Sequence, residues 1–358
     1  MGSLIRCGLV FVLFVGALFA AARFLPGPLL LGREEPDGTR WTYRMNGLAL
    51  FVATHLVVAA ATLVFDLSLS PLIHHFWSYF LAANLFALFV ALRLYARARP
   101  ALVAAGKDPA ALPLARRFMG IELNPRRLGV DLKTFFYQPS LIGLGLLVAA
   151  FAYAQFERYG TITPQMGLFV VLWWIYLATH YHYEEFMITT WDVIAENFGF
   201  GLLWGDLVLV PFFYCIGGWT LLEQLRPMST PSILAIAALY ALGLWIFRSS
   251  NAQKHRFKKD AATVIWGAPA ETMDGKLLVS GFWGVGRHLN YTGEILVYLA
   301  ITLTTGFDSP VPYLLPLWMC ALLAHRAMRD DRRCRAKYGE LWERYCHRAR
   351  FKMVPGVY

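Results

Sequence analysis

The chain has 358 residues, of which 58% are hydrophobic and only 16% are charged. A soluble domain of this size carries about a quarter charged residues, so the composition excludes an ordinary soluble globular protein. The formal net charge is +10, and the positions of the basic residues decide whether it indicates nucleic-acid binding or membrane orientation.

Apolar segments long enough to cross a bilayer, about 20 residues each, recur along the whole chain. They are rich in Leu, Ala and Phe and lack strict alternation, which predicts helices and not the strands of a β-barrel. We therefore predict an all-α fold, a polytopic transmembrane bundle of nine spans. A tenth is added if residues 183–200 or a broken helix count separately. The predicted spans are 4–24, 46–66, 72–93, 139–157, 164–182, 201–222, 231–248, 290–306 and 311–327.

The first of these spans has features of a signal peptide, because Arg6 precedes an apolar run with small residues at its end. We predict a retained helix, since the rest of the chain is already polytopic. The chain is expected to form a single integral membrane domain. Its parts are the N-terminal helices with a basic loop at 1–138, the middle helices at 139–248 and a C-terminal part at 249–358.

Nearly all of the 33 Lys and Arg residues fall in four segments, at 23–44, 93–133, 248–287 and 325–358. With nine spans, these segments lie on one side of the membrane, which the positive-inside rule makes cytoplasmic. The net charge therefore follows from topology, and we expect membrane lipids and no nucleic acid as partners. The expected location is a bacterial inner membrane or the endoplasmic reticulum.

The sequence does not predict a metal site or a disulfide framework. Its five cysteines form no CxxC and no Cys/His spacing. His180 and His182 are two residues apart, which does not place both on one helix face, so we expect no metal there.

The segment THYHYEEFMITTWD, 179–192, gathers acidic and phenolic side chains at the end of a predicted span. No Lys or Arg occurs between residues 159 and 225, and unpaired carboxyls near lipid tend to have a raised pKa. A protonated acid in an apolar pocket can donate a proton in catalysis. The candidate catalytic residues are Tyr181, Tyr183, Glu184, Glu185 and Asp192.

A basic segment, SSNAQKHRFKKD, follows the span that ends near residue 248. It is either an ordinary cytoplasmic anchor or a phosphate clamp. Lys254 and Lys258 are four residues apart, so on a continuing helix they share one face. Two cations on one face suit a pyrophosphate or a ribose 2′-phosphate.

The segment GFWGVGRHLNYTGE, 281–294, places polar groups where a membrane helix begins, and polar groups at that depth are normally kept for chemistry or binding. Trp283 offers a flat ring for stacking. Arg287 and His288 can bind phosphate or ribose, and Asn290 both donates and accepts hydrogen bonds. The glycines do not form a dinucleotide-binding GxGxxG motif, and no strand precedes them.

A third cluster, HRAMRDD, spans 325–331. Arg326 and Asp330 are four residues apart, so they form either a local ion pair or a pair that binds phosphate and a ribose hydroxyl. The aromatic and basic tail that follows, 328–358, is predicted to lie on the membrane, to fold back over the bundle or to form a solvated surface helix.

Taken together, these segments resemble the membrane sterol reductases, which include delta-14 sterol reductase, 7-dehydrocholesterol reductase and the membrane half of the lamin B receptor. The resemblance runs in order over residues 40–358. The segments that carry it are YRMNGL (43–48), GIELNPR with DLK (120–133), EEFMITTWD (184–192), GFGLLWGDLVLVPFFY (199–214), FRSSNAQKHRFK (247–258), GFWGVGRHLNYTGE (281–294) and HRAMRDDRRCRAKYGELWERYC (325–346).

The resemblance implies NADPH-dependent reduction of a sterol double bond, with a sterol pocket that involves residues 176–192. Tyr183 stands where family members often have His. NADPH contacts are implied for Lys254, Lys258, Trp283, Arg326, Asp330 and Tyr345, and the same signature includes Arg287, His288, Asn290 and Tyr291.

An isolated alkene is a poor hydride acceptor, so the expected chemistry is protonation at one carbon followed by hydride transfer from the cofactor. The segments TTWD and YRMNGL favour delta-14 reduction, with delta-7 and C-24 reduction as the alternatives. Two other functions stay open at this point. One is an isoprenylcysteine-type membrane methyltransferase that uses S-adenosylmethionine, although Leu289 replaces that family's usual Pro. The other is a non-catalytic sterol-binding protein.

Overall fold

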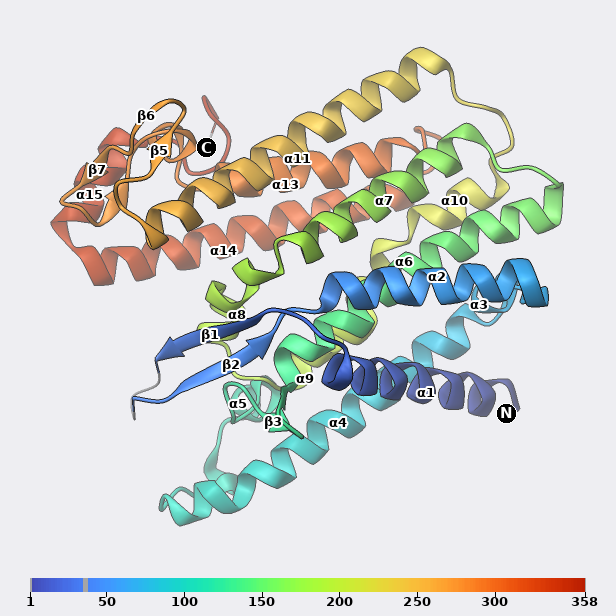
Figure 1. Cartoon of the computed structure of the whole chain (residues 1–358), viewed down its shortest axis with the longest axis horizontal. Helices are drawn as coiled ribbons and strands as arrows, with labels where there is room; N and C mark the ends of the chain where they lie inside the picture. Colours follow the sequence, from blue (N-terminus) through green and yellow to red (C-terminus); the bar gives the residue numbers. More distant parts are fainter. Residues whose placement is uncertain (1, 35–37, 358) are drawn as a thin grey trace. The chain divides into compact units, whose positions relative to one another are not determined.

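The computed structural model describes residues 2–34 and 38–357, which form two compact units, Met1–Leu225 and Arg226–Tyr358. We call them the amino-terminal and the carboxy-terminal unit. Both consist mainly of helices (Figure 1).

The helices of the amino-terminal unit follow the predicted apolar segments closely. Its long helices are α1 (Gly2–Phe24), α2 (Gly47–Phe65), α4 (Phe76–Ala104), α6 (Leu132–Tyr159) and α7 (Pro164–His182). Its short helices are α3 (Ser70–His74), α5 (Leu114–Met119), α8 (Trp191–Ile194), α9 (Phe200–Trp204) and α10 (Gly217–Glu223), with 3₁₀ turns at Pro109–Ala111 and Glu184–Thr189.

Helix α6 is the central element of this unit. It packs against α1, α2, α3, α7 and α10, and much of its length is buried. Trp219 of α10 lies edge to face against Phe151 of α6, with ring centroids 5.1 Å apart. A methyl group on Gly218 would collide with the Phe151 ring, so glycine permits this close approach.

The span predicted at 201–222 is not one regular helix. Residues Gly205–Phe213 wind as a π-helix between α9 and α10. Pro211 lies within this stretch and has no backbone N–H to donate. A π-helix is rare and commonly occurs at functional sites.

Two β-hairpins connect helices of this unit. One precedes α2 and the other precedes α6. Strands β1 (Leu29–Glu34) and β2 (Arg40–Arg44) pair antiparallel, with Leu29 opposite Arg44. Strands β3 (Arg126–Arg127) and β4 (Val130–Asp131) form a tight hairpin within the predicted basic loop. Its turn residues, Leu128 and Gly129, both have positive φ, as a type I′ turn requires.

The β3–β4 hairpin leads directly into α6. The carboxylate of Asp131 accepts a hydrogen bond from the Thr134 N–H at 2.9 Å, which caps the helix. The hairpin therefore fixes where α6 begins and which of its faces carries Asp131.

The carboxy-terminal unit contains the predicted basic segment as part of a helix. Its helices are α11 (Thr230–Lys259), α12 (Phe282–Val285), α13 (Leu289–Leu303), α14 (Leu314–Tyr338) and α15 (Glu340–Arg348), with a 3₁₀ turn at Val311–Tyr313. Two small hairpins pair β5 (Val264–Ile265) with β6 (Ala268–Pro269) and β7 (Thr272–Met273) with β8 (Leu277–Leu278).

Helices α11 and α13 pack closely because glycines meet at their contact. A methyl group on Gly293 would lie 2.5 Å from the backbone nitrogen of Phe247, and one on Gly243 would lie 2.8 Å from the Leu296 side chain. Small residues allow membrane helices to approach in this way.

The tail after α14 folds back onto its own unit. This agrees with one of the three arrangements predicted for the tail, the one in which it folds back. Helix α15 buries Leu341, Trp342 and Tyr345. The Trp342 indole donates to Asp331 on α14 at 3.2 Å.

Within the described part of the chain, seven helical segments are long and apolar enough to cross a membrane. They match seven of the nine predicted spans. The other two predicted spans also form helices, α7 and the shorter α13. The fold is thus mainly helical and multi-pass, as the sequence predicted.

Candidate active site

Trp283 organises one polar cluster in the carboxy-terminal unit. The residue is buried, and its indole nitrogen donates to the main-chain oxygen of Ser250 at 2.8 Å. The Tyr345 hydroxyl donates to the main-chain oxygen of Trp283 at 3.1 Å. The ammonium of Lys254 lies 4.3 Å from the centre of the indole ring, a cation–π contact. The ring that was predicted to offer a stacking surface therefore has a lysine over one face.

Arg287 connects this cluster to the tail of the protein. The buried residue donates from its backbone nitrogen to the Phe351 oxygen at 2.9 Å. Its Nη1 donates to the Ala349 oxygen at 3.0 Å, and its Nε lies 4.0 Å from Asp331 Oδ1. Arg287 therefore holds the tail in place, a role that its sequence position did not reveal.

His288 and Asn290 each place polar side-chain atoms in the interior of the unit. The imidazole of His288 is buried and stacks on Tyr291, with ring centroids 5.0 Å apart. Burial, reinforced by the charges of Lys254 and Arg287, lowers the pKa of His288 to about 3. Asn290 Nδ2 donates to Asn251 Oδ1 at 3.2 Å.

His288 Nε2 and Asn290 Oδ1 are both buried and have no hydrogen-bond partner among residues 2–34 and 38–357. Unsatisfied buried polar atoms are uncommon and call for an explanation. A bound ligand with hydrogen-bonding groups would supply one.

The remaining predicted cofactor residues lie at the ends of α11 and α14. Lys258 is exposed one turn beyond Lys254, and both lysines interact electrostatically with Asp330. Asp330 also lies 3.8 Å from Arg333. Arg326 is exposed one turn before Asp330 on α14. The two helices therefore bring several cations and one carboxylate together.

A cavity of about 300 Å³ lies in the amino-terminal unit. The predicted catalytic residue Glu184 lines it. So do Asp131 and Gln138, which were not predicted as site residues. The other lining residues are Ala22, Arg23, Leu29, Thr42, Tyr43, Arg44, Met45, Asn46, Gly129, Val130, Thr134, Phe135 and Met187.

Glu184 is held at this cavity by two hydrogen bonds. Its Oε2 accepts from the Gly47 N–H, and its Oε1 accepts from Gln138 Nε2, both at 2.9 Å. Burial raises the pKa of Glu184, and the two hydrogen bonds oppose that shift. Tyr181 is buried beside it, and its hydroxyl donates to the Gln138 main-chain oxygen at 3.4 Å.

The other predicted acids lie in different surroundings. Tyr183 stacks on Phe186, and Glu185 is half-buried. Asp192 accepts a hydrogen bond from the Tyr137 hydroxyl at 3.3 Å. None of these three residues lines the described cavity.

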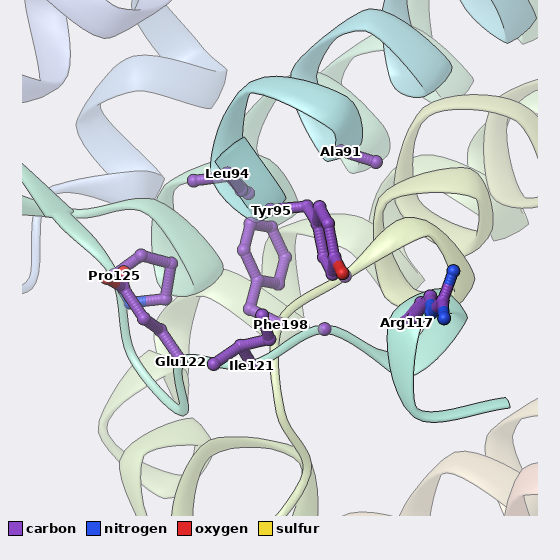
Figure 2. A pocket seen from close by; sticks show the side chains of 10 residues that line it. Ala91, Leu94, Tyr95, Arg117, Ile121, Glu122, Pro125 and Phe198 are labelled. Carbon is purple, nitrogen blue, oxygen red and sulfur yellow. The ribbon is translucent and has the colours of Figure 1, made fainter. Parts of the chain in front are cut away.

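A backbone hydrogen bond holds the segment that follows Asp192. Phe198 donates from its backbone nitrogen to the Glu122 oxygen at 2.8 Å. Figure 2 shows the side chains from α4, α5 and the loop at 120–125 that surround Phe198. The space between them is about 10 Å³, room for no more than one water molecule. This contact is therefore structural.

The sequence predicted no metal site. In the part of the chain that the structure describes, no three His, Cys, Asp or Glu side chains gather as metal ligands would.

Comparison with known proteins decides the family. Residues 6–358 match the family described as "Ergosterol biosynthesis ERG4/ERG24 family". The chain belongs to that family. It is therefore an enzyme of the sterol reductase family and a multi-pass integral membrane protein.

Several ERG4/ERG24 relatives are similar over nearly the whole chain. The Delta(14)-sterol reductase of Arabidopsis thaliana is 35% identical over 98% of this chain and 95% of its own length. The Delta(14)-sterol reductase of Methylotuvimicrobium alcaliphilum is 38% identical over 93% of this chain and 79% of its own length. The 7-dehydrocholesterol reductase of Xenopus laevis is 33% identical over 94% of this chain and 75% of its own length.

Three residues with a part in these sites were missed by sequence reasoning: Asp131, Gln138 and Asp331. Asp131 stands in the DLK segment, and the seven-residue spacing to Gln138 predicts that both share one face of a helix. That spacing was the available signal. Asp331 had no such signal, because its partners Arg287 and Trp342 come from separate elements.

Proposed function

We propose that this protein is an NADPH-dependent sterol reductase that saturates a carbon–carbon double bond of a sterol, with the delta-14 bond favoured over delta-7 or C-24. Two unsatisfied buried atoms carry the proposal: His288 Nε2, which lies within the electrostatic influence of Lys254, and Asn290 Oδ1. The names of the relatives from Arabidopsis thaliana and Methylotuvimicrobium alcaliphilum support the delta-14 preference.

The residues of this cluster fit a dinucleotide phosphate. Lys254, Lys258 and Arg326 supply cations for phosphate groups, and Asp330 supplies an acceptor for a ribose hydroxyl. His288 stays neutral because its pKa is lowered to about 3, so its unprotonated nitrogen accepts a hydrogen bond at physiological pH. NADPH, when bound, supplies the hydride.

Within this cluster, Trp283 and Tyr345 act as positioning residues. Trp283 fixes the Lys254 ammonium by the cation–π contact, and Tyr345 fixes the backbone of Trp283. Arg287 keeps the tail closed over the same unit. A preorganised set of cations binds phosphate without losing side-chain entropy at the moment of binding.

Glu184 is the proton donor that the geometry favours among the five candidates. It lines the cavity, and burial raises its pKa, which favours the protonated form that a proton donor needs. Each Glu184 oxygen accepts one hydrogen bond, so one oxygen can still carry a proton. Tyr181 is buried near Glu184, and its hydroxyl donates to the main-chain oxygen of Gln138.

The proposal is tested by incubating the purified protein with NADPH and a panel of delta-14, delta-7 and C-24 unsaturated sterols, read by mass spectrometry. We expect a gain of two hydrogens in the delta-14 sterol and slower turnover with NADH. Absence of reduction for every sterol would overturn the proposal. Binding of S-adenosylmethionine with no binding of NADPH would instead support a methyltransferase.

A further inference from the structure

The cavity in the amino-terminal unit contains two buried hydrogen-bond acceptors with no donor. Asp131 is 3% exposed and Gln138 is 4% exposed. Asp131 Oδ2 and Gln138 Oε1 receive no hydrogen bond from any residue that the structure describes. Both residues line the cavity. Arg126 Nε lies 3.9 Å from Asp131 Oδ2, a long ion pair.

The structure fixes both side chains in this arrangement. Asp131 Oδ1 accepts from the Thr134 N–H at 2.9 Å, which leaves Oδ2 for the cavity. Gln138 Nε2 donates to Glu184 at 2.9 Å, so the amide is oriented with Oε1 as its unused acceptor. The cavity therefore presents two hydrogen-bond acceptors, and a ligand that satisfies them must carry a hydrogen-bond donor.

The two acceptors lie along one face of α6. Residues 131, 134, 135 and 138 all line the cavity, which is the spacing of a single helix face. Seven residues of α-helix rise by about 10 Å, so the acceptors are two turns apart. Asp131 stands at the first turn, next to the basic loop, and Gln138 stands deeper in the span.

The walls between the two acceptors are largely apolar. Phe135, Met187, Met45 and Leu29 contribute to them. A rigid, apolar ligand with a hydroxyl at one end fits such a cavity, because the hydroxyl stays at the membrane surface and the rings point inward. An ammonium ligand would also donate, but Arg23 and Arg44 line the same cavity and disfavour a cation.

We propose that this cavity holds the hydroxyl-bearing end of the sterol, with Asp131 Oδ2 accepting the hydrogen bond of the sterol hydroxyl. The inference rests on the proposed sterol reductase function. A carboxylate is a stronger acceptor than an amide oxygen, which assigns the hydroxyl to Asp131.

The spacing between Asp131 and Glu184 also limits which double bond of the sterol can reach the proton donor. The hydroxyl stands at one end of the fused rings, and the aliphatic tail begins at the other end. With the hydroxyl at Asp131, Glu184 lies beside Gln138, two turns of α6 or about 10 Å further along. This spacing places the proton donor against a ring carbon. A ring double bond is therefore the substrate, and a C-24 double bond in the aliphatic tail is not.

The test compares binding of a 3-hydroxy sterol with that of its 3-ketone, which accepts hydrogen bonds but cannot donate. The variant is Asp131→Asn. Asn keeps the helix cap through its side-chain oxygen and presents an amide donor to the cavity instead of an acceptor. Exposed Asp66 is the matched control, because Asp66→Asn changes a left-handed C-cap residue that Asn also tolerates.

We expect wild type and Asp66→Asn to bind the hydroxy sterol at least about tenfold more tightly than the ketone. Asp131→Asn should lose that preference or reverse it. An unchanged preference in Asp131→Asn, with sterol binding and reduction by wild type intact, would overturn this inference alone. Failure of wild type to bind any sterol would overturn both this inference and the proposed function.

A second measurement needs no variant. A photoreactive sterol that retains its hydroxyl is irradiated with the wild-type protein, and the labelled peptide is identified by mass spectrometry. Labelling of residues 129–138 that an excess of unlabelled hydroxy sterol prevents supports the inference. Labelling confined to other segments contradicts it, even if Asp131→Asn fails to fold.

Discussion

The ammonium of Lys133 donates a hydrogen bond to the main-chain oxygen of Asp192 at 2.7 Å. The same ammonium donates to the main-chain oxygens of Val193 at 3.4 Å and Glu196 at 2.5 Å. Lys133 is almost fully buried, so these bonds replace its hydration. One side chain of α6 thus holds the segment that joins the predicted acids to the π-helix.

Replacing Lys133 by Met should release this segment while keeping the length of the side chain. We expect a loss of about 2 kcal/mol in the free energy of unfolding, because three main-chain carbonyls lose a charged donor. Thermal unfolding in detergent and hydrogen exchange of residues 191–197 measure the effect. The exposed Lys276 provides the control variant Lys276→Met. Equal exchange in the two variants would contradict the role of Lys133.

Lys254→Ala should weaken NADPH binding at the carboxy-terminal cluster. The variant removes a cation that the Trp283 ring holds in place. We expect the KM for NADPH to rise about tenfold or more and the preference for NADPH over NADH to fall, since a charged hydrogen bond is lost. Steady-state kinetics with both cofactors measure the ratio, and Lys276→Ala is the control. An unchanged ratio would argue against a 2′-phosphate site near Lys254.

Glu184→Gln should abolish most turnover while NADPH binding persists. Loss of a general acid lowers rates by about 10²–10⁴. The control is Glu223→Gln, which removes a carboxylate from an exposed pair with Arg158. Sterol turnover and NADPH affinity are measured in parallel. Full turnover of Glu184→Gln would transfer the role of proton donor to Tyr181, Tyr183, Glu185 or Asp192.

The pH dependence of turnover gives a further check on Glu184. Burial raises its pKa from the ordinary value of 4.5. The acid form donates the proton, so turnover should fall as pH rises through the raised pKa. The unfolded chain ionises at the ordinary value, so this group's contribution to stability also declines over the same range. Glu184→Gln should therefore unfold at a temperature that depends less on pH above 4.5.

The pKa of His288 is shifted in the opposite direction, so its effect on stability changes with pH in the opposite sense. Its pKa is lowered to about 3 in the folded protein, against an ordinary value of 6.5. Between these values the unfolded chain binds a proton that the folded chain does not bind, so stability falls as pH falls below 6.5. We expect a loss of about 2 kcal/mol between pH 6.5 and pH 5, which His288→Gln should remove. Equal pH dependence of unfolding in His288→Gln and wild type would contradict the lowered pKa.

The regular parts of the fold could be predicted because their signals are local. Apolar runs placed the long helices, and the spacing of Lys254 and Lys258 correctly put both on a continuing α11. The hairpin β3–β4 was predicted only as a loop, since its two strands are two residues each. The π-helix at Gly205–Phe213 has no pattern in the sequence that distinguishes it from an α-helix.

The site was harder to predict because it depends on distant segments. Asp131 acquires its buried oxygen without a hydrogen-bond donor only when the β1–β2 hairpin and the turn at Glu184 close around it. Trp283 was predicted to offer a ring for stacking, and the structure adds a cation–π contact from Lys254 on another element. Neither contact is visible in the spacing of residues along the sequence.

The bonds between Arg287 and residues 349–351 have a consequence for biogenesis. The helices that enter the membrane are complete by Tyr338, yet Arg287 receives its acceptors only from carbonyls made later. The long helices are therefore synthesised before the residues that close the carboxy-terminal cluster. The cluster around Arg287 is thus completed by residues that are made after every long helix.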